Sequence, residues 1–261
     1  MLRLRHPIAC FGPADADIRA YIVPEAMNDL PYRDPKEIRD EFLRRADEGY
    51  KKFSDTVTVP GDHAVIGIRM PLIKRFAKDI CAGDWRTYLD TVGDEYHEDL
   101  LLRGLIISYA KTDIDEKFRL IRDFVPEMDN WAVCDSFAMS FRIPKKDTDA
   151  YWELAIPYLD TNREFQIRFA IVMMLAHFVD KEHIDRIIGY MDSIKHPGYY
   201  VKMAAAWCIC ECFLKFPDKT MGFLKNNTLD NFTFGKALSK ITDSFRVDDG
   251  TKGIIRAMRR K

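Results

Sequence analysis

The chain has 261 residues, of which 47% are hydrophobic and 31% charged, a composition typical of soluble proteins. No apolar run reaches the ~18–20 residues of a membrane span, and the six cysteines lie mostly in apolar helical contexts, which favours reduced thiols in the cytoplasm. The net charge of −1 hides an asymmetry, because residues 199–261 carry 12 Lys and Arg against 6 Asp and Glu. This asymmetry permits a polyanion partner at the C-terminal end, although solvated helix faces explain it equally well.

Residues 1–31 are rich in proline and lack periodicity, so we expect an N-terminal arm of uncertain order there and one repeat domain over 32–261. The segment 54–69 is the only β-like stretch and is predicted to be a loop. The first predicted helix covers 34–53, where Asp34 can cap it and Pro35 suits its first turn. The remaining predicted helices cover residues 71–82, 84–92, 97–111, 114–126, 129–141, 147–159, 163–179, 181–192, 198–215, 217–225, 231–245 and 249–259.

These helices and their connections are short, and the helices come in pairs roughly 35–45 residues apart. The spacing predicts an all-α fold, a right-handed superhelical α-solenoid of HEAT-like helix pairs with a concave face. A compact all-α bundle is the competing architecture.

Two charged residues interrupt runs that otherwise indicate buried helices. Asp135 lies among Trp131, Cys134 and Phe137, and a carboxylate there needs a partner or a task. Trp131 and Asp135 are four residues apart and would share one helix face. In residues 167–179 the only polar side chains are Arg168 and His177. Arg168 could form an internal salt bridge with Asp135, or it could open onto a cavity and hold an anion. His177 is expected to be a hydrogen-bonded core histidine.

A third unusual segment is residues 199–213. Three consecutive alanines precede Trp207, so its ring is open to approach, or else the small residues permit close helix packing. Tyr199, Tyr200 and Lys202 add aromatic and basic character at the start of the same helix, which suits phosphate contact or has no special role. No cysteine or histidine pairs have zinc spacing, and the common nucleotide, metalloprotease and hydrolase motifs are absent from the sequence.

The chain resembles the AlkD-like DNA alkylation repair family, alkylpurine DNA glycosylases built from HEAT-like repeats. The resemblance runs from about Tyr50 to about Phe245. It is carried by five segments in order: GIRMPLIKRFAKDI (67–80) with DW (84–85), YHEDLLLRGLIISYAK (96–111), DNWAVCDSF (129–137), REFQIRFAIVMML (163–175) and KMAAAWCICECF (202–213).

The resemblance implies an active cleft of Trp131, Asp135, Arg168 and Trp207, whose spacing follows the family pattern. In this reading Asp135 stabilises positive charge on the deoxyribose and orients water, the two indoles lie against the sugar, and Arg168 holds a backbone phosphate. The implied substrate is duplex DNA with cationic N3- or N7-alkylated purines, cleaved by a monomer without cofactor or metal and without extruding the base.

Two other functions stay open. Relatives of this family keep the fold but bind branched DNA without catalysis. A solenoid can also serve as a protein-interaction scaffold.

Overall fold

The structure is a computed structural model that describes residues 34–57, 61 and 63–260. The arm expected at 1–31 lies outside these residues. Fourteen α-helices are found in the described part of the chain, and its only β pairing is a single bridge between Ala64 and Tyr96. Their bounds are α1 (Pro35–Arg44), α2 (Glu48–Val57), α3 (Met70–Cys81), α4 (Trp85–Thr91), α5 (His97–Tyr109), α6 (Ile114–Phe124), α7 (Trp131–Met139), α8 (Thr148–Ala155), α9 (Glu164–Met173), α10 (Ile184–Ser193), α11 (Tyr199–Lys215), α12 (Pro217–Lys225), α13 (Asn231–Asp243) and α14 (Asp249–Ala257).

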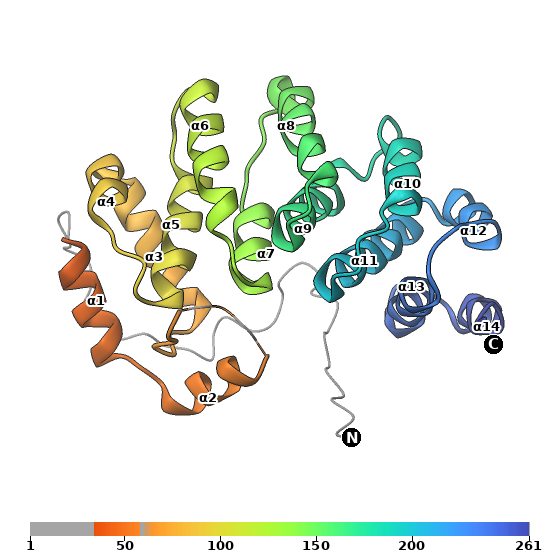
Figure 1. Cartoon of the computed structure of the whole chain (residues 1–261), viewed down its shortest axis with the longest axis horizontal. Coiled ribbons are helices and arrows are strands. Elements are labelled where there is room, and N and C mark those ends of the chain that lie inside the picture. The colour runs from red at the N-terminus through yellow and green to blue at the C-terminus, as the bar shows by residue number, and fades with distance from the viewer. Residues whose placement is uncertain (1–33, 58–60, 62, 261) are drawn as a thin grey trace.

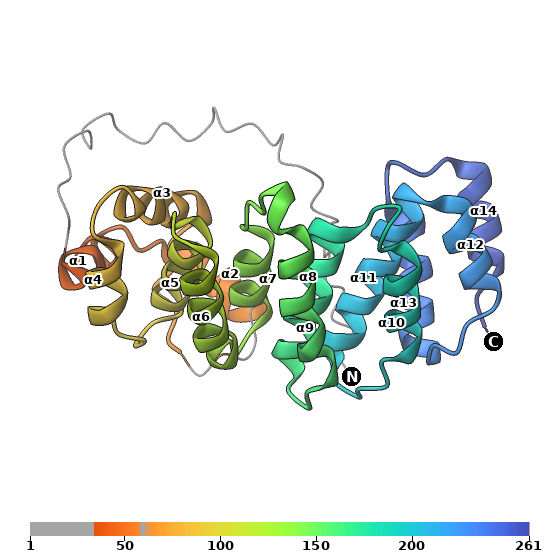
Figure 2. The ribbon, with the colours of Figure 1, turned by 90° about the horizontal axis from the view of Figure 1, so that it is seen from above.

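The helices stack in chain order into a curved, two-row array (Figure 1). Helices α3, α5, α7, α9, α11 and α13 each pack against the next and form the inner row of the arc, whereas α4, α6, α8, α10 and α12 form the outer row. Turned by 90°, the array extends along its length from α1 to α14 (Figure 2). The prediction of an α-solenoid is confirmed, and this sequential stacking excludes a compact bundle.

Polar contacts of similar sequence separation link neighbouring helix pairs. The Arg168–Asp135 pair spans 33 residues, Lys219–Asp185 spans 34, and Arg246–Glu211 spans 35. These similar separations indicate a repeat unit of about this length, at or just below the lower bound of the predicted 35–45 residues. The contacts tie each unit to its neighbour, as expected of a solenoid whose stability comes from nearest-neighbour interfaces.

The core is a continuous apolar seam between the two rows. Phe137 of α7 is at its centre, with its ring centroid 4.9 Å from those of Phe124 and Phe141 and 5.6 Å from that of Phe169. Edge-to-face and offset arrangements of this kind favour aromatic packing beyond the area they bury. The seam fixes α7 and α9 rigidly beside each other.

The predicted helix 34–53 is two helices, α1 and α2, with a break at residues 45–47. Asp47 causes the break because its carboxylate accepts the Tyr50 N–H at 2.9 Å and so begins a new helix. The Asp47 carboxylate also accepts a hydrogen bond from Arg69, and the Asp47 backbone N–H donates to the carbonyl of Gly67, so the following loop holds this residue in place. Residues 54–57, predicted to be loop, complete α2.

The loop after α2 is anchored by one buried carboxylate. Glu98 is 1% exposed and accepts backbone N–H bonds from Ile66, Gly67 and Ile68 at 2.8–3.1 Å. Gly67 has φ of +102°, a left-handed conformation that favours glycine. Glu98 therefore replaces the missing partners of three consecutive backbone amides and fastens this loop to α5.

Candidate functional site

Helix α7 presents Trp131 and Asp135 on one side. Asn130 caps the helix, its side-chain oxygen accepting the N–H groups of Ala132 at 2.9 Å and Val133 at 3.0 Å. Trp131 and Asp135 are partly buried, one turn apart, on the side of α7 away from its buried face. The predicted common face is therefore present on an inner-row helix.

Asp135 meets Arg168 of α9 in a bidentate ion pair. The Nε and Nη2 atoms of Arg168 donate to Oδ1 and Oδ2 of Asp135, both at 2.7 Å, and Nη1 donates to the carbonyl of Tyr200 in α11 at 2.9 Å. The side chain of Arg168 is 7% exposed and that of Asp135 is 13% exposed. Of the two alternatives for Arg168, the structure shows the internal salt bridge, and the guanidinium joins three consecutive inner helices.

The electrostatics of this cluster follow from its burial. Burial alone would lower the pKa of Arg168, but the charge of Asp135 and its hydrogen bonds outweigh this effect and raise the pKa. Each Asp135 oxygen accepts one N–H from Arg168 and keeps a second acceptor position. The carboxylate is thus fixed in orientation and can still accept a hydrogen bond from a water molecule.

The start of α11 is held by α9. Glu164 accepts the Tyr200 N–H at 2.5 Å, and a Cβ added at Gly198 would lie 2.5 Å from the same carboxylate. Residue 198 must therefore lack a side chain for Glu164 to reach the helix end. This contact places the Tyr200 carbonyl where Arg168 binds it.

Trp207 lies seven residues after Tyr200 on α11, about 10 Å further along the helix axis. Its ring packs partly against the core, and its indole Nε1 is buried without a hydrogen-bond partner. Ala204, Ala205 and Ala206 are buried at 0–3% exposure, which favours close helix packing as the reason for the alanine run. Trp207 and the Tyr200 carbonyl that Arg168 binds thus belong to the same inner-row helix, α11.

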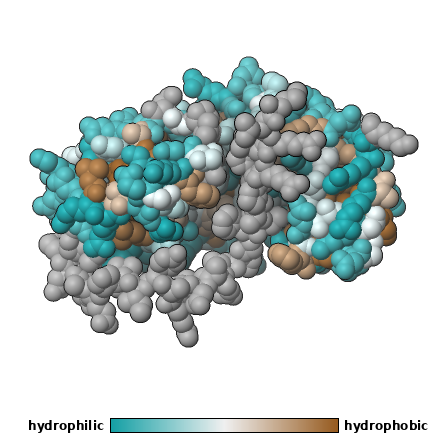
Figure 3. Space-filling view, turned by 90° about the horizontal axis from the view of Figure 1, so that it is seen from below, coloured by the Kyte–Doolittle hydropathy of each residue, from teal (hydrophilic) through white to brown (hydrophobic). Residues whose placement is uncertain are grey.

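The aromatic and basic residues at the start of α11 form a surface patch. Tyr199 is 43% exposed, and its ring lies 5.2 Å from that of Tyr200 and 5.8 Å from that of Phe232. Lys202 is paired with Asp230 at 3.6 Å. Seen from the concave side, hydrophilic residues cover much of the surface at both ends of the array (Figure 3).

His177 is hydrogen-bonded, as predicted, but it is half-buried rather than part of the core. It lies in a π-helical turn, Met174–Phe178, and its Nε2 is 2.8 Å from the carbonyl of Ala138. Burial lowers its pKa. Among the described residues no cluster of potential metal ligands is present, and no helix is both long and apolar enough to cross a bilayer.

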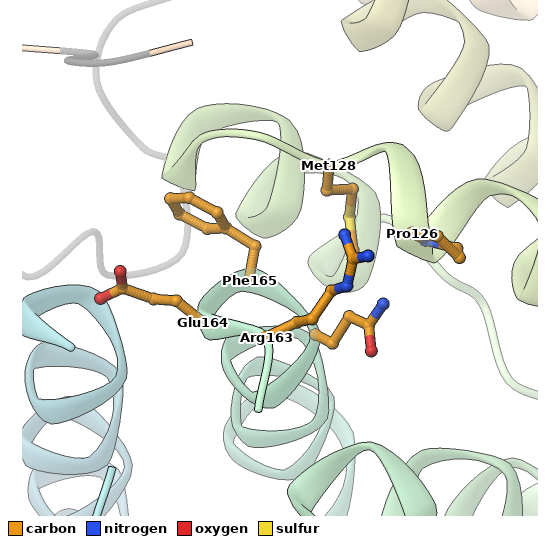
Figure 4. Close-up of a pocket in the computed structure, with 6 residues that line it drawn as sticks. Pro126, Met128, Arg163, Glu164 and Phe165 are labelled. Carbon is orange, nitrogen blue, oxygen red and sulfur yellow. The ribbon is translucent and has the colours of Figure 1, made fainter. Parts of the chain in front are cut away.

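A pocket of about 290 Å³ adjoins the cluster at the start of α9. Arg163 points toward Met128 on one side, whereas Glu164 and Phe165 point the other way (Figure 4). Glu164 lies one turn before Arg168, so the pocket opens beside the helix end that carries the ion pair.

Two groups that hold Arg168 and the start of α11 in place were not predicted from the sequence. The Tyr200 carbonyl carries no side-chain signal and could not have been found. Glu164 could have been suspected, because Gly198 is a helix cap that offers no side-chain oxygen of its own.

A family model described as DNA alkylation repair enzyme matches residues 38–241. A search of curated proteins finds no match.

Proposed function

The chain belongs to the DNA alkylation repair enzyme family, and on that premise we propose that it is a monofunctional DNA glycosylase. Its substrate would be cationic N3- or N7-alkylated purines in duplex DNA, with no cofactor. The observation that carries the proposal is the carboxylate of Asp135, oriented by a buried arginine on an inner-row helix. A solenoid wraps around a partner more readily than it closes over one nucleotide, which supports cleavage of the N-glycosidic bond while the base stays stacked.

The reaction needs little acid catalysis. Alkylation has already given the purine a positive charge, so the base departs with the electron pair of the N-glycosidic bond and becomes neutral. The deoxyribose is left with oxocarbenium character, water adds to its anomeric carbon, and one proton is released to the surroundings. The products are a free base and an abasic site. Catalysis therefore requires negative charge and π-electron density beside the sugar.

In this proposal Asp135 supplies the charge and accepts a hydrogen bond from the attacking water. Trp131, one turn away on α7, and Trp207 on α11 lay their rings against the sugar. The resemblance assigns Arg168 to a backbone phosphate. Because three of its five N–H donors already bind Asp135 and Tyr200, we propose that Arg168 acts mainly by orienting Asp135.

The patch at the start of α11 is proposed to contact the DNA backbone. Tyr199 is exposed and Lys202 is 27% exposed, so both can reach a ligand. Hydroxyl and ammonium groups are common partners of phosphate oxygens. Their contribution would be to affinity rather than to sequence choice.

The decisive experiment incubates the protein with duplex DNA containing 7-methylguanine and measures free base. Native protein should release the base, and an Asp135→Asn variant should be slower by at least about a hundredfold. Undamaged DNA is the control for background release. Absence of release by the native protein, or full release by the variant, would refute the proposal.

One observation favours a second function, a DNA-structure reader without catalysis. The ion pair with Arg168 gives the Asp135 carboxylate a partner within the protein, as expected of a carboxylate whose role is purely structural. This alternative predicts tighter binding to four-way junctions than to linear duplex. It also predicts that Asp135→Asn leaves junction affinity unchanged once the variant is shown to be folded.

A further inference from the structure

A second pocket, of about 250 Å³, lies near the C-terminal end of the inner row. One wall is a single face of α13, formed by Phe232, Gly235, Lys236 and Ser239 at helical spacing. The other residues come from the first turn of α13 and from the segment after α14. The complete lining is Asn231, Phe232, Phe234, Gly235, Lys236, Ser239, Arg259 and Arg260.

The lining is strongly positive. It contains three cationic side chains and no carboxylate. The pocket beside α9, in contrast, has one arginine and one glutamate. A concave site lined by one sign of charge concentrates ligands of the opposite sign. The chemistry of this pocket therefore suits an anion.

The three cationic side chains differ in how firmly they are held by other residues. Arg260 is a fixed wall, because it donates to the carbonyl of Leu229 at 2.6 Å and to Oδ1 of Asn227 at 2.7 Å, and it lies 4.2 Å from the Phe234 ring centroid. Arg259 is exposed and makes one long bond of 3.3 Å, to Ser239 Oγ. Arg259 retains N–H donors for a ligand.

Lys236 lines the pocket beside Phe232. Its Nζ is 5.5 Å from the centre of the Phe232 ring, which is 39% exposed. Gly235 also lines the pocket, and a Cβ added there would meet no atom within 4 Å. A ligand can therefore approach the α13 backbone beside a lysine and an arginine, whose N–H groups are donors that phosphate oxygens accept. The hydroxyl of Ser239 donates instead to the carbonyl of Gly235 at 3.0 Å.

The pocket is continuous with the patch at the start of α11. Phe232 lines the pocket, and its ring centroid lies 5.8 Å from that of Tyr199 and 6.0 Å from the Nζ of Lys202. A polyanion lying along the inner row would meet both features. A small free anion bound in the pocket would not extend to the α11 patch.

We propose that this pocket binds a backbone phosphate of duplex DNA away from the lesion, through Lys236 and Arg259. The inference rests on the proposed function in one respect, that DNA lies along the inner row. The contact anchors the C-terminal end of the solenoid on the duplex and adds affinity for any sequence.

The test uses the full chain and undamaged duplex DNA, with binding followed by fluorescence anisotropy at several salt concentrations. The variants are Lys236→Gln, Arg259→Gln and the double variant. We expect the double variant to bind about tenfold more weakly near 0.1 M salt, and the plot of log K against log salt to be flatter by about 1 for each cation replaced. Arg119→Gln, an exposed arginine of the outer row, is the matched control and should bind like the native protein.

The outcomes separate this inference from the glycosylase proposal. At saturating protein, single-turnover release of 7-methylguanine by the double variant should equal that of the native protein, because the pocket does not touch the lesion. Native affinity and salt dependence in the double variant would overturn the inference even if base release is normal. So would inorganic phosphate binding that depends on Arg259 while duplex affinity does not. Conversely, weaker duplex binding by the double variant with no base release by any protein would refute the glycosylase alone.

Discussion

Asp135 and Arg168 are 33 residues apart in the chain and form a two-pronged ion pair, with both N–O distances at 2.7 Å. The pair links α7 to α9, and the third bond of Arg168 reaches α11. The proposed catalytic orientation of Asp135 and the stabilisation of the fold therefore depend on the same two side chains. Any variant of either residue has to be measured for both.

Breaking this ion pair should lower the free energy of unfolding, and the losses in the two single variants should not be additive. Asp135→Asn and Arg168→Met each leave a mostly buried charge without its partner, so each should lower the free energy of unfolding by about 3–5 kcal/mol. The double variant should lose less than the sum by at least about 2 kcal/mol. Urea unfolding measures all four proteins. The exposed pair Arg119–Asp123, 3.7 Å apart, is the control and should show almost no coupling.

Trp207 should act through its ring rather than its N–H group. Because Nε1 has no hydrogen-bond partner, Trp207→Phe removes no bond and keeps an aromatic face. We expect Trp207→Ala to slow base release by about ten- to a hundredfold, as loss of ~1–3 kcal/mol of charge stabilisation implies. Trp207→Phe should be several-fold faster than the alanine variant.

The matched control for Trp207 is Trp152 of α8, whose Nε1 is likewise buried without a partner. Trp152 lies in the outer row, so Trp152→Phe should change stability without changing base release at saturating protein. Equal loss of release in Trp152→Phe and Trp207→Phe would mean that packing, not contact with the sugar, explains the effect.

Helix content and order could largely be derived from the sequence, because apolar periodicity and caps are local signals. Most predicted helices end within a few residues of the observed ones. The helix predicted over 34–53 was wrong as a single element, since its break depends on Asp47 meeting Gly67 and Arg69 across the loop. No local pattern reports such a contact.

The residues of the candidate site could be selected only in part from the sequence, for a similar reason. A charged residue in an apolar helix is visible in sequence, so Asp135 and Arg168 could be selected, but their pairing could not be distinguished from anion binding. The positively charged pocket beside α13 escaped notice because its lysine and its two arginines belong to different segments and are unremarkable in each. The roles of Trp131, Asp135, Arg168 and Trp207 stay predictions until base release is measured.

Acidification should destabilise the fold through His177. Burial lowers the pKa of this histidine below its value of about 6.5 in the unfolded chain. Between the two pKa values the unfolded state binds more protons, so the stabilisation is complete above pH 6.5 and is lost as the pH falls through the folded pKa. His97 has a pKa lowered by burial too and contributes with the same sign.

Thermal unfolding at pH 7 and pH 5 measures this dependence. His177→Gln can keep a donor facing the Ala138 carbonyl while removing the titration, so its loss of stability between the two pH values should be smaller than that of the native protein. The remaining loss is assigned to His97 and to the other titrating groups. An identical loss in both proteins would show that His177 is not a source of the pH dependence.

Two glycines within helices should respond oppositely to alanine. A Cβ at Gly104 of α5 would lie 3.0 Å from Cε1 of Phe124 and 3.4 Å from Cβ of Phe137. Both phenylalanines are 1% exposed and packed against each other at 4.9 Å, so neither ring can yield. Gly104→Ala should therefore lower the free energy of unfolding by about 1–3 kcal/mol. At Gly189 of α10 the added Cβ meets no atom within 4 Å.

Gly189→Ala should raise the free energy of unfolding by about 0.5–1 kcal/mol, because alanine loses less backbone entropy on entering a helix. Urea unfolding of both variants tests the sign of each change. Since Gly104 sets how closely α5 approaches α6 and α7, its alanine variant should also weaken duplex binding if the curvature of the inner row matters for DNA. Gly189→Ala should leave duplex binding unchanged, because α10 belongs to the outer row. Stabilisation by alanine at both positions would mean that the α5–α7 spacing is loose, and that the inner row does not hold its residues in a fixed geometry.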